Sequence, residues 1–323
     1  MIRLTVYNRK NMHAPTILIT SPTPLAEWEL QIQIQQALSN KLTGQIQIAF
    51  TNGRTESILV QHGKVRSLYI RNHRLPNTNW ETPLARFGRG TLAIEPLPAR
   101  ALTYRKVLIE EITHPQVQPS GTNQLKTMFS LAEHNPNPTL FHIRWEKAEG
   151  FVLAAGGHVP VRQAVFITPA LTEDGNLAYE HMAIWDEARC NVTVHHGDIK
   201  NQAWLELHLN ILFEWYCQNI LHHYKQLTGI VMVRSILQSL SILAENRGWT
   251  ISTHDQQLQD ASLFQSAAET GNVYREIISI VRTRIQPIIG SSLTDYLIKQ
   301  SIEPTRGIYK TIQETFGLIE EPQ

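Results

Sequence analysis

Apolar and polar residues alternate with period two in the first third of the chain. Ile46, Ile48 and Phe50 alternate with Gln or Ala, and the Asn-Gly pair within residues 51–54 is typical of a hairpin turn. The same alternation predicts further strands at residues 57–60, 65–70 and 89–95. Together these runs predict an antiparallel meander.

Helical spacing frames this meander on both sides. Before it, apolar side chains recur at helical intervals, at Leu25, Trp28, Ile32 and Leu38. After it, residues 100–113 show the same spacing. We interpret residues 23–113 as one helix–meander–helix unit.

The beginning of the chain allows two interpretations. Residues 1–22 form an N-terminal strand segment with two short strand-like runs, at 2–7 and 16–19. Met12 is an alternative translation start, in which case the first run would not belong to the protein. The helix that follows is predicted to begin at Pro24, with Thr23 as its cap and Glu27 completing a capping box.

The order of elements recurs in the second third of the chain. A helix is predicted over 123–133, followed by strands at 140–145, 151–154, 161–167 and 190–195. The alignment of the two copies pairs Phe50 with Trp145, Gly63 with Gly157, Ile70 with Ile167 and Leu92 with Val192. We interpret residues 122–200 as a second, degenerate copy with the same strand order, joined to the first by a proline-containing linker at 114–121.

From residue 201 the pattern is helical. The first helix is apolar on more than one face, which indicates burial, and Gly229 ends it. Later helices are expected to end at Gly248 and, after a short strand at 249–252, to occupy 267–286, 291–301 and 304–316. Residues 201–323 should form one α-helical domain with Leu212, Trp215, Ile236 and Leu240 in its core. The predicted fold class is α+β, with two small antiparallel β-meander/helix units followed by an α-helical domain.

Composition narrows the possible functions. Of 323 residues, 42% are hydrophobic and 18% charged, which excludes a disordered chain. The formal net charge of +1 argues against a nucleic-acid binder. Two cysteines, Cys190 and Cys217, cannot form a disulfide framework, which favours a reducing cytoplasm. No apolar run approaches the ~18 residues of a membrane span and the start lacks a signal-peptide core, so we expect a cytoplasmic protein without membrane insertion.

The common catalytic motifs are missing from the sequence. Gly88-Arg89-Gly90 lacks the Gly-Lys-Ser/Thr end of a phosphate loop, and no Gly-x-Ser-x-Gly elbow occurs. His195, His196 and Asp198 are candidate metal ligands. Adjacent histidines on a strand point to opposite faces, however, so an exposed polar strand end is the alternative. We predict no catalytic residue and no cofactor.

Three segments of the first unit resemble PATAN-type domains, small bacterial modules often attached to response-regulator receiver domains. The segments are the Leu-Thr-Gly entry at 42–48, the His-Gly-Lys-Val turn at 62–65 and the strand at 90–94. The resemblance covers residues 24–112, and residues 122–215 look like a degenerate copy in which Pro138-Thr139 replaces the Thr-Gly turn. It implies protein contacts in signalling and motility control, including type IV pilus regulation, and brings no catalytic residues. The chain lacks a recognisable receiver domain, so direct control by phosphorylation is not expected.

The expected function is therefore a non-enzymatic cytoplasmic adaptor or regulator that binds another protein. A small-ligand sensor or enzyme, with its site between the second β unit and the helical domain, is the alternative, which a deep polar pocket would favour. Candidate partner-binding residues are Ile280 and Leu297. They represent two apolar stripes, of Ile277, Ile280, Val281 and Ile288, and of Leu293, Leu297 and Ile298. Packing of the two stripes against each other in the core is the other interpretation.

Overall fold

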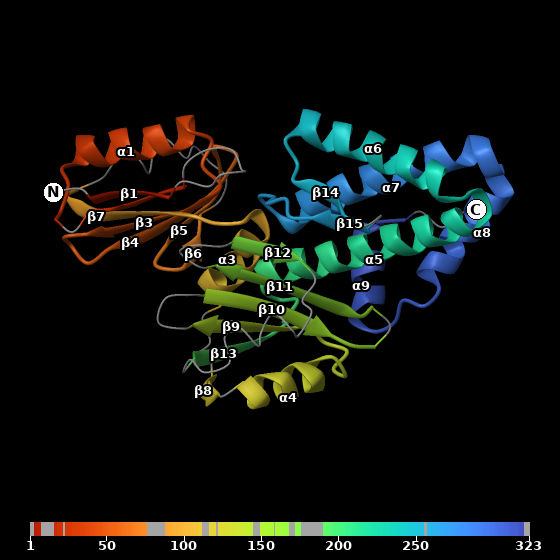
Figure 1. Cartoon of the computed structure of the whole chain (residues 1–323), viewed down its shortest axis with the longest axis horizontal. Helices are drawn as coiled ribbons and strands as arrows, with labels where there is room; N and C mark the ends of the chain where they lie inside the picture. The colour runs from red at the N-terminus through yellow and green to blue at the C-terminus, as the bar shows by residue number, and fades with distance from the viewer. Residues whose placement is uncertain are drawn as a thin grey trace. The chain divides into compact units, whose positions relative to one another are not determined.

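The computed structural model in Figure 1 divides the chain into two compact units. The first comprises residues 1–114, 147–149 and 165–174, and the second comprises residues 115–146, 150–164 and 175–323. The structure describes residues 3–7, 16–21, 23–75, 88–111, 116–120, 122–144, 149–157, 159–167, 172–175, 190–254 and 257–319. The α+β fold class predicted from the sequence is confirmed. The second β unit and the helices belong mostly to one compact unit and not to two separate domains.

A seven-stranded sheet forms the centre of the first unit, in the order β1-β2-β7-β3-β4-β5-β6. The strands are β1 (Arg3–Tyr7), β2 (Thr16–Thr20), β3 (Gly44–Phe50), β4 (Thr55–Gln61), β5 (Lys64–Ile70), β6 (His73–Arg74) and β7 (Gly90–Pro96). The helices described in this unit are α1 (Glu27–Ser39) and α3 (Ala99–Glu110). The predicted N-terminal segment therefore adds two strands to the sheet of the first unit, and Met12 lies outside the described residues.

The central strands of this sheet are buried on both faces. Ile58 and Val60 of β4 belong to the cluster that packs beneath α1, whereas Leu59 between them points to the other face. Helix α3 contacts β3 and β4. Helices α1 and α3 thereby bury the apolar side chains of the sheet, as a three-layer arrangement of helix, sheet and helix requires.

Helix α1 begins one turn later than its sequence predicted. Leu25 pairs with Gly90 as an isolated β-bridge, with the Leu25 amide donating to the Gly90 carbonyl at 2.7 Å. This pairing holds the chain extended, so Ala26 becomes the N-cap and its amide donates to the Glu29 carboxylate at 2.7 Å. The predicted capping box of Thr23 and Glu27 is therefore wrong.

The apolar face of α1 also differs from the predicted one. Leu30, Ile34 and Ala37 are buried in the core cluster, while Trp28 and Ile32 are 62% and 46% exposed. The sheet covers the face that carries Leu30, Ile34 and Ala37, which recur at intervals of four and three residues, and Leu25 and Leu38 of the predicted set are partly buried against the same cluster.

A six-stranded sheet follows, in the order β12-β11-β10-β9-β13-β8. Its strands are β8 (Gln116–Ser120), β9 (Thr139–Arg144), β10 (Glu149–Ala155), β11 (Val161–Ile167), β12 (Thr172–Gly175) and β13 (Cys190–His196), and α4 (Thr122–Ala132) lies between β8 and β9 in the chain. The order from β8 to β12 reproduces the order from β2 to β6 in the first sheet, with β13 in the place of β7. The predicted common strand order is confirmed; Trp145 lies outside the described residues.

One glycine in each copy shows the same steric requirement. A Cβ atom on Gly63 would lie 2.3 Å from the Leu38 carbonyl oxygen, and one on Gly156 would lie 1.9 Å from the Glu133 carbonyl oxygen. Each amide also donates to the chain just after the preceding helix, Gly63 to Leu42 and Gly156 to Asn135. By its close approach to the preceding helix, Gly156 is therefore the structural equivalent of Gly63. Gly157, which the sequence alignment paired with Gly63, shares only the positive φ of Gly63.

The predicted linker at 114–121 contains a strand. Residues 116–120 form β8, which pairs antiparallel with β13 in the register Gln118 to Val192. Pro119 is compatible with this strand because β8 lies at the edge of the sheet. Residues 112–115 and 121 lie outside the described residues.

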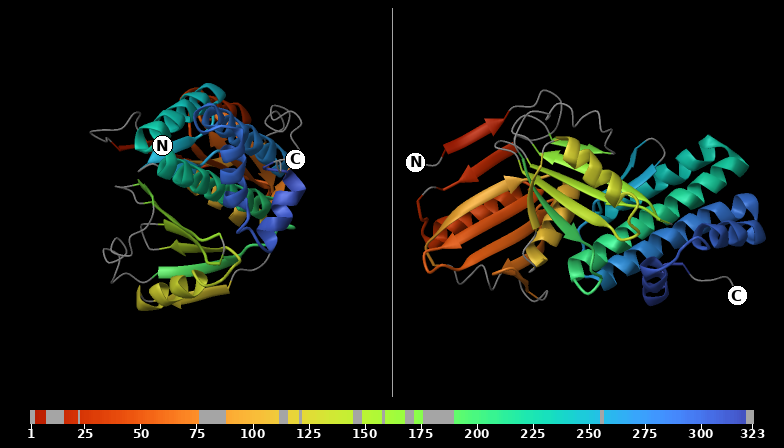
Figure 2. Two further views of the ribbon diagram at one scale, coloured as in Figure 1. Left: turned by 90° about the vertical axis from the view of Figure 1, so that its right-hand side faces the viewer. Right: turned by 90° about the horizontal axis from the view of Figure 1, so that it is seen from below.

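The helical part of the second unit contains five described helices and a β-hairpin (Figures 1 and 2). They are α5 (Gln202–Thr228), α6 (Ile230–Arg247), β14 (Ile251–His254), β15 (Gln257–Asp260), α7 (Ala267–Ile289), α8 (Ser291–Ile302) and α9 (Ile308–Phe316). Leu212, Ile236 and Leu240 lie in the core as predicted, and Trp215 is half-buried.

Two helix boundaries depart from the sequence prediction. Helix α7 continues through Pro287 to Ile289. A proline in the last turn removes only one backbone N–H donor, so the helix does not have to end before it. Helix α9 begins at Ile308 and not at residue 304, because Pro304 and Gly307, with φ of 58°, occupy the turn before it. Among the residues that the structure describes, no helix combines the length and the apolar character needed to cross a membrane.

Substitution of Leu240 by Ala tests the helical core. The side chain is 1% exposed, so its truncation should lower the free energy of unfolding by about 2–5 kcal/mol. Ile242 lies on the same helix but is 54% exposed, and Ile242→Ala should change stability by less than about 0.5 kcal/mol. Chemical denaturation followed by circular dichroism measures both variants. Equal losses from the two would contradict the assignment of Leu240 to the core.

Substitution of Gly156 by Ala tests the close approach in the second copy. Its new Cβ atom must displace the Glu133 carbonyl, which should destabilise the second unit by about 1–3 kcal/mol. Gly88 has nothing within 4 Å of the corresponding position, so Gly88→Ala is the control and should unfold as the parent protein does. Differential scanning calorimetry separates the outcomes, and an unchanged transition for Gly156→Ala would refute the close packing.

Candidate functional site

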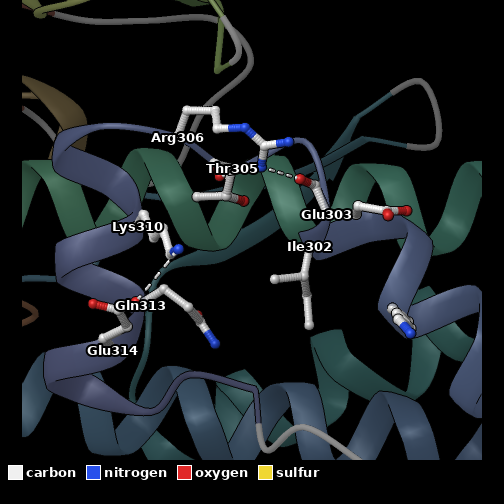
Figure 3. A pocket seen from close by; sticks show the side chains of 8 residues that line it. Ile302, Glu303, Thr305, Arg306, Lys310, Gln313 and Glu314 are labelled. Atoms are coloured by element: carbon white, nitrogen blue, oxygen red, sulfur yellow. Dashed lines mark hydrogen bonds and ion pairs between the residues drawn. The ribbon is translucent and has the colours of Figure 1, made fainter.

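A pocket opens between α8 and α9 in the second unit (Figure 3). Its volume is about 390 Å³. The lining residues are Lys299, Ile302, Glu303, Thr305, Arg306, Lys310, Gln313 and Glu314. Most of these side chains are exposed, so the pocket is an open depression with charged walls.

The turn between the two helices builds the pocket. The Thr305 amide donates to the Ile302 carbonyl at 2.8 Å, and Pro304 prevents α8 from continuing. The Arg306 guanidinium then donates to the Glu303 and Thr305 carbonyls at 2.6 and 3.0 Å. Arg306 therefore fixes the turn through one of its nitrogens while its positive charge remains at the pocket wall.

Buried contacts hold this turn and α9 against α5. Thr305 is buried, and its hydroxyl lies 3.1 Å from the Tyr216 hydroxyl of α5. Burial raises the pKa of Tyr216 to about 12, so the phenol keeps its proton and can share this hydrogen bond. Tyr309 and Ile312 of α9 are buried as well. The pocket wall is thus a packed part of the unit and not a loose appendage.

His208 of α5 packs against Tyr309 of α9. Its ring is fully buried and meets the Tyr309 ring edge to face, with the centroids 5.4 Å apart. Neither ring nitrogen has a hydrogen-bond partner in the described part of the chain. Burial lowers the pKa of His208 to about 4, so the imidazole is neutral at pH 7 and packs as an aromatic side chain.

Three basic and two acidic side chains line the pocket. Lys310 Nζ is 3.9 Å from Glu314 Oε1, and both side chains are about two-thirds exposed, so this ion pair is weak. Figure 3 shows Ile302 and Gln313 directed into the space between the helices, and the Glu303 carboxylate directed away from it. Within the described residues, Lys299 Nζ has no ion-pair partner, and the Gln313 side-chain carbonyl, although shielded from water, accepts no hydrogen bond.

Chemically, the pocket offers groups that bind. Lys299, Arg306 and Lys310 can meet a carboxylate or phosphate, and Ile302 supplies an apolar contact. The one hydroxyl in the lining, Thr305, is already engaged with Tyr216. Recognition of an anionic group beside an apolar side chain is the chemistry that this arrangement favours.

A second polar cluster lies deep in the same unit. The Glu214 carboxylate of α5 accepts hydrogen bonds from the Asp260 amide and from the Gln163 side chain of β11, both at 2.7 Å. Asp260 accepts from the Tyr274 hydroxyl at 2.6 Å and from the Ser262 hydroxyl at 2.6 Å. Burial raises the pKa of Asp260 to about 6 despite these donors. The place where the alternative enzyme site was expected is thus occupied by a hydrogen-bonded junction of carboxylates.

The candidate metal ligands do not come together. His195 is buried and its neighbour His196 is exposed, as their positions on β13 require. Asp198 is exposed and accepts a hydrogen bond from the Lys200 amide in the turn before α5. No group of three or more potential metal ligands is present among the described residues. The two histidines therefore lie on opposite faces of β13, and Asp198 lies in the turn that follows the strand.

The two partner-binding candidates differ in exposure. Leu297 is 2% exposed, and Ile277, Val281 and Ile298 are buried with it, whereas Ile280 is half-buried. In this conformation a partner could not reach Leu297. Its burial favours the interpretation in which the two stripes pack in the core.

Sequence reasoning missed the pocket residues. Lys299, Arg306 and Lys310 stand seven and four residues apart, which on one continuous helix would indicate only a solvated polar face. The break at Pro304 folds the two helices toward each other and gathers these charges. The spacing of the cations on both sides of Pro304 is the sequence feature from which the pocket could have been predicted.

Protonation of His208 should weaken the unit in acid. Its pKa is about 4 in the folded chain and about 6.5 when unfolded, so the unfolded state binds more protons between these values. The free energy of unfolding should therefore fall by about 2 kcal/mol between pH 7.5 and pH 5. His208→Phe keeps a ring against Tyr309 and should remove this loss, so the comparison of variant and parent by urea denaturation isolates it. A pH dependence that is the same in both proteins would contradict the burial of a neutral imidazole.

Comparison with known proteins leaves the family open. No protein-family model matches the chain, no curated protein matches it, and no solved structure matches it. The assignment of a function therefore depends on the residues and the geometry of the chain itself.

Proposed function

We propose that this chain is a non-enzymatic adaptor or regulator, and that the α8–α9 pocket holds an acidic segment of a partner protein. The observation that carries the proposal is the lining of this pocket, which combines three cations, Lys299, Arg306 and Lys310, with the apolar Ile302. A carboxylate of the partner would meet the cations, and an apolar neighbour would cover Ile302.

The shape of the pocket favours a protein segment over a free small molecule. Small-molecule sites bury about 70–90% of their ligand's surface. Here the charged walls are exposed, so a small ligand would keep much of its surface in water. A peptide segment can place one or two side chains in about 390 Å³ while the rest of the partner covers the rim.

Three further points support the regulatory side of the proposal. The resemblance of residues 24–112 to PATAN-type domains implies protein contacts in bacterial signalling or motility control, and type IV pilus regulation is its implied context. Cys190 and Cys217 are buried and are not joined in a disulfide, which supports a reducing compartment such as the cytoplasm. The strand order shared by the two sheets is consistent with two related modules carried on one chain.

Selection from a random peptide library tests the proposal. Peptides selected on the full chain should be enriched in Asp and Glu next to an apolar residue. The double variant Lys299→Glu and Lys310→Glu reverses two exposed charges and should weaken the selected peptides at least tenfold in fluorescence anisotropy. The matched control, Lys64→Glu with Lys200→Glu, makes the same charge change at exposed positions outside the pocket and should bind as the parent does.

Three results would contradict the proposal. If the selected peptides had no acidic bias, the cations of the pocket would not be their binding groups. If both double variants lost the same peptide affinity, the net charge of the protein alone would explain the binding. Displacement of the peptides by free glutamate or succinate at micromolar concentration would favour the small-ligand sensor instead. Circular dichroism of every variant confirms that folding is unchanged.

A further inference from the structure

The two helix junctions of the second unit lie at one end of its helical bundle. Figures 1 and 2 both show the α5–α6 and α7–α8 junctions at the end of the bundle away from the second sheet. Each junction is a single glycine, Gly229 with φ of 85° and Gly290 with φ of 82°. No loop stands between the two helices at either junction, so only the helices themselves can cover the side chains near each glycine.

Several exposed side chains near the two junctions are apolar. Of the nine large apolar side chains that are exposed in the described part of the chain, five flank the two junctions. They are Leu227, Val231, Ile288, Leu293 and Tyr296, and Val231 is 71% exposed. We refer to these five residues as the bundle end. An exposed apolar group of this kind marks a surface that meets another apolar phase.

The two stretches of sequence that contain the junctions carry basic residues and no acidic ones. Residues 215–244 contain no Asp or Glu, and neither do residues 277–294. The cations in these two stretches are Lys225, Arg234, Arg282 and Arg284. Asp295 is the first acidic residue after them, and the Arg282 guanidinium neutralises it at 2.6 Å. Lys225, Arg234 and Arg284 are exposed.

We propose that the bundle end docks on an anionic lipid surface. Apolar side chains at helix ends can enter the boundary between head groups and acyl chains, while the exposed cations behind them meet negatively charged head groups. The inference is independent of the α8–α9 pocket, because none of the five residues lines it.

Two features favour lipid over other occupants. A second copy of the chain would bring the same exposed cations, Arg234 and Arg284, together, and like charges across an interface oppose association. A partner helix needs a groove along the helices, whereas these side chains project from helix ends and junctions. Docking of this kind is a surface contact and needs no membrane-spanning segment.

Vesicle co-sedimentation of the full chain tests the inference. The chain should sediment with vesicles of 30% phosphatidylserine in phosphatidylcholine, and at least tenfold less with phosphatidylcholine alone. Raising the salt concentration should weaken the binding, because it screens the cations. Val231→Asp with Ile288→Asp should reduce binding at least tenfold. Ile242→Asp with Leu131→Asp, two exposed apolar positions elsewhere, should leave it unchanged.

Charge reversal tests the cations separately. Arg234→Glu with Arg284→Glu retains the apolar side chains and should abolish the preference for phosphatidylserine. Equal binding to both vesicle types, or no binding to either, would overturn the inference. Self-association of the parent in analytical ultracentrifugation that Val231→Asp with Ile288→Asp abolishes, without vesicle binding, would identify a second copy as the occupant and would also overturn it.

Discussion

The burial of α5 is the constraint on which the second unit depends. This helix is 27 residues long and buries 16 of them, including the polar residues Asn210 and Glu214. A buried carboxylate or amide costs free energy unless it is hydrogen-bonded. Glu214 takes its donors from β11 and β15, and Asn210 donates to Asp260 and to Tyr274 of α7. These hydrogen bonds tie the sheet, the hairpin and α7 to α5.

The position of α5 in the repeat explains why the second β unit and the helices form one body. In the first copy β7 leads into the short helix α3, and in the second copy β13 leads into α5. The helix that ends the second copy is therefore also the central helix of the bundle. Near its middle, Tyr216 anchors the turn that builds the pocket through Thr305, and at its far end Gly229 forms one of the two tight junctions. Both proposed binding surfaces thus depend on the same buried helix.

Local patterns allowed the element order to be predicted, and contacts distant in sequence decided the rest. Alternation at Ile46, Ile48 and Phe50 predicted β3, but the start of α1 could not be predicted because it depends on pairing between Leu25 and Gly90. Residues 116–120 were interpreted as linker because Pro119 suggests no strand, and only the partner β13 makes them one.

The site was even less accessible to prediction. The sequence drew attention to His195 and His196, whose types suggest chemistry, whereas the pocket uses lysines and an arginine that any surface helix could carry. Their convergence arises from a turn at Pro304 and from the packing of Tyr309 on His208.

Native-state hydrogen exchange of the full chain tests most directly whether α5 unites the second unit. If it does, the backbone amides of β9, β13 and the buried middle of α5 exchange through the same opening reaction, with one free energy and one dependence on denaturant concentration. Exchange of β9 and β13 at a clearly lower free energy, while α5 and α7 stay protected, would contradict the account. The second β unit would then be a separate domain that the helices do not need.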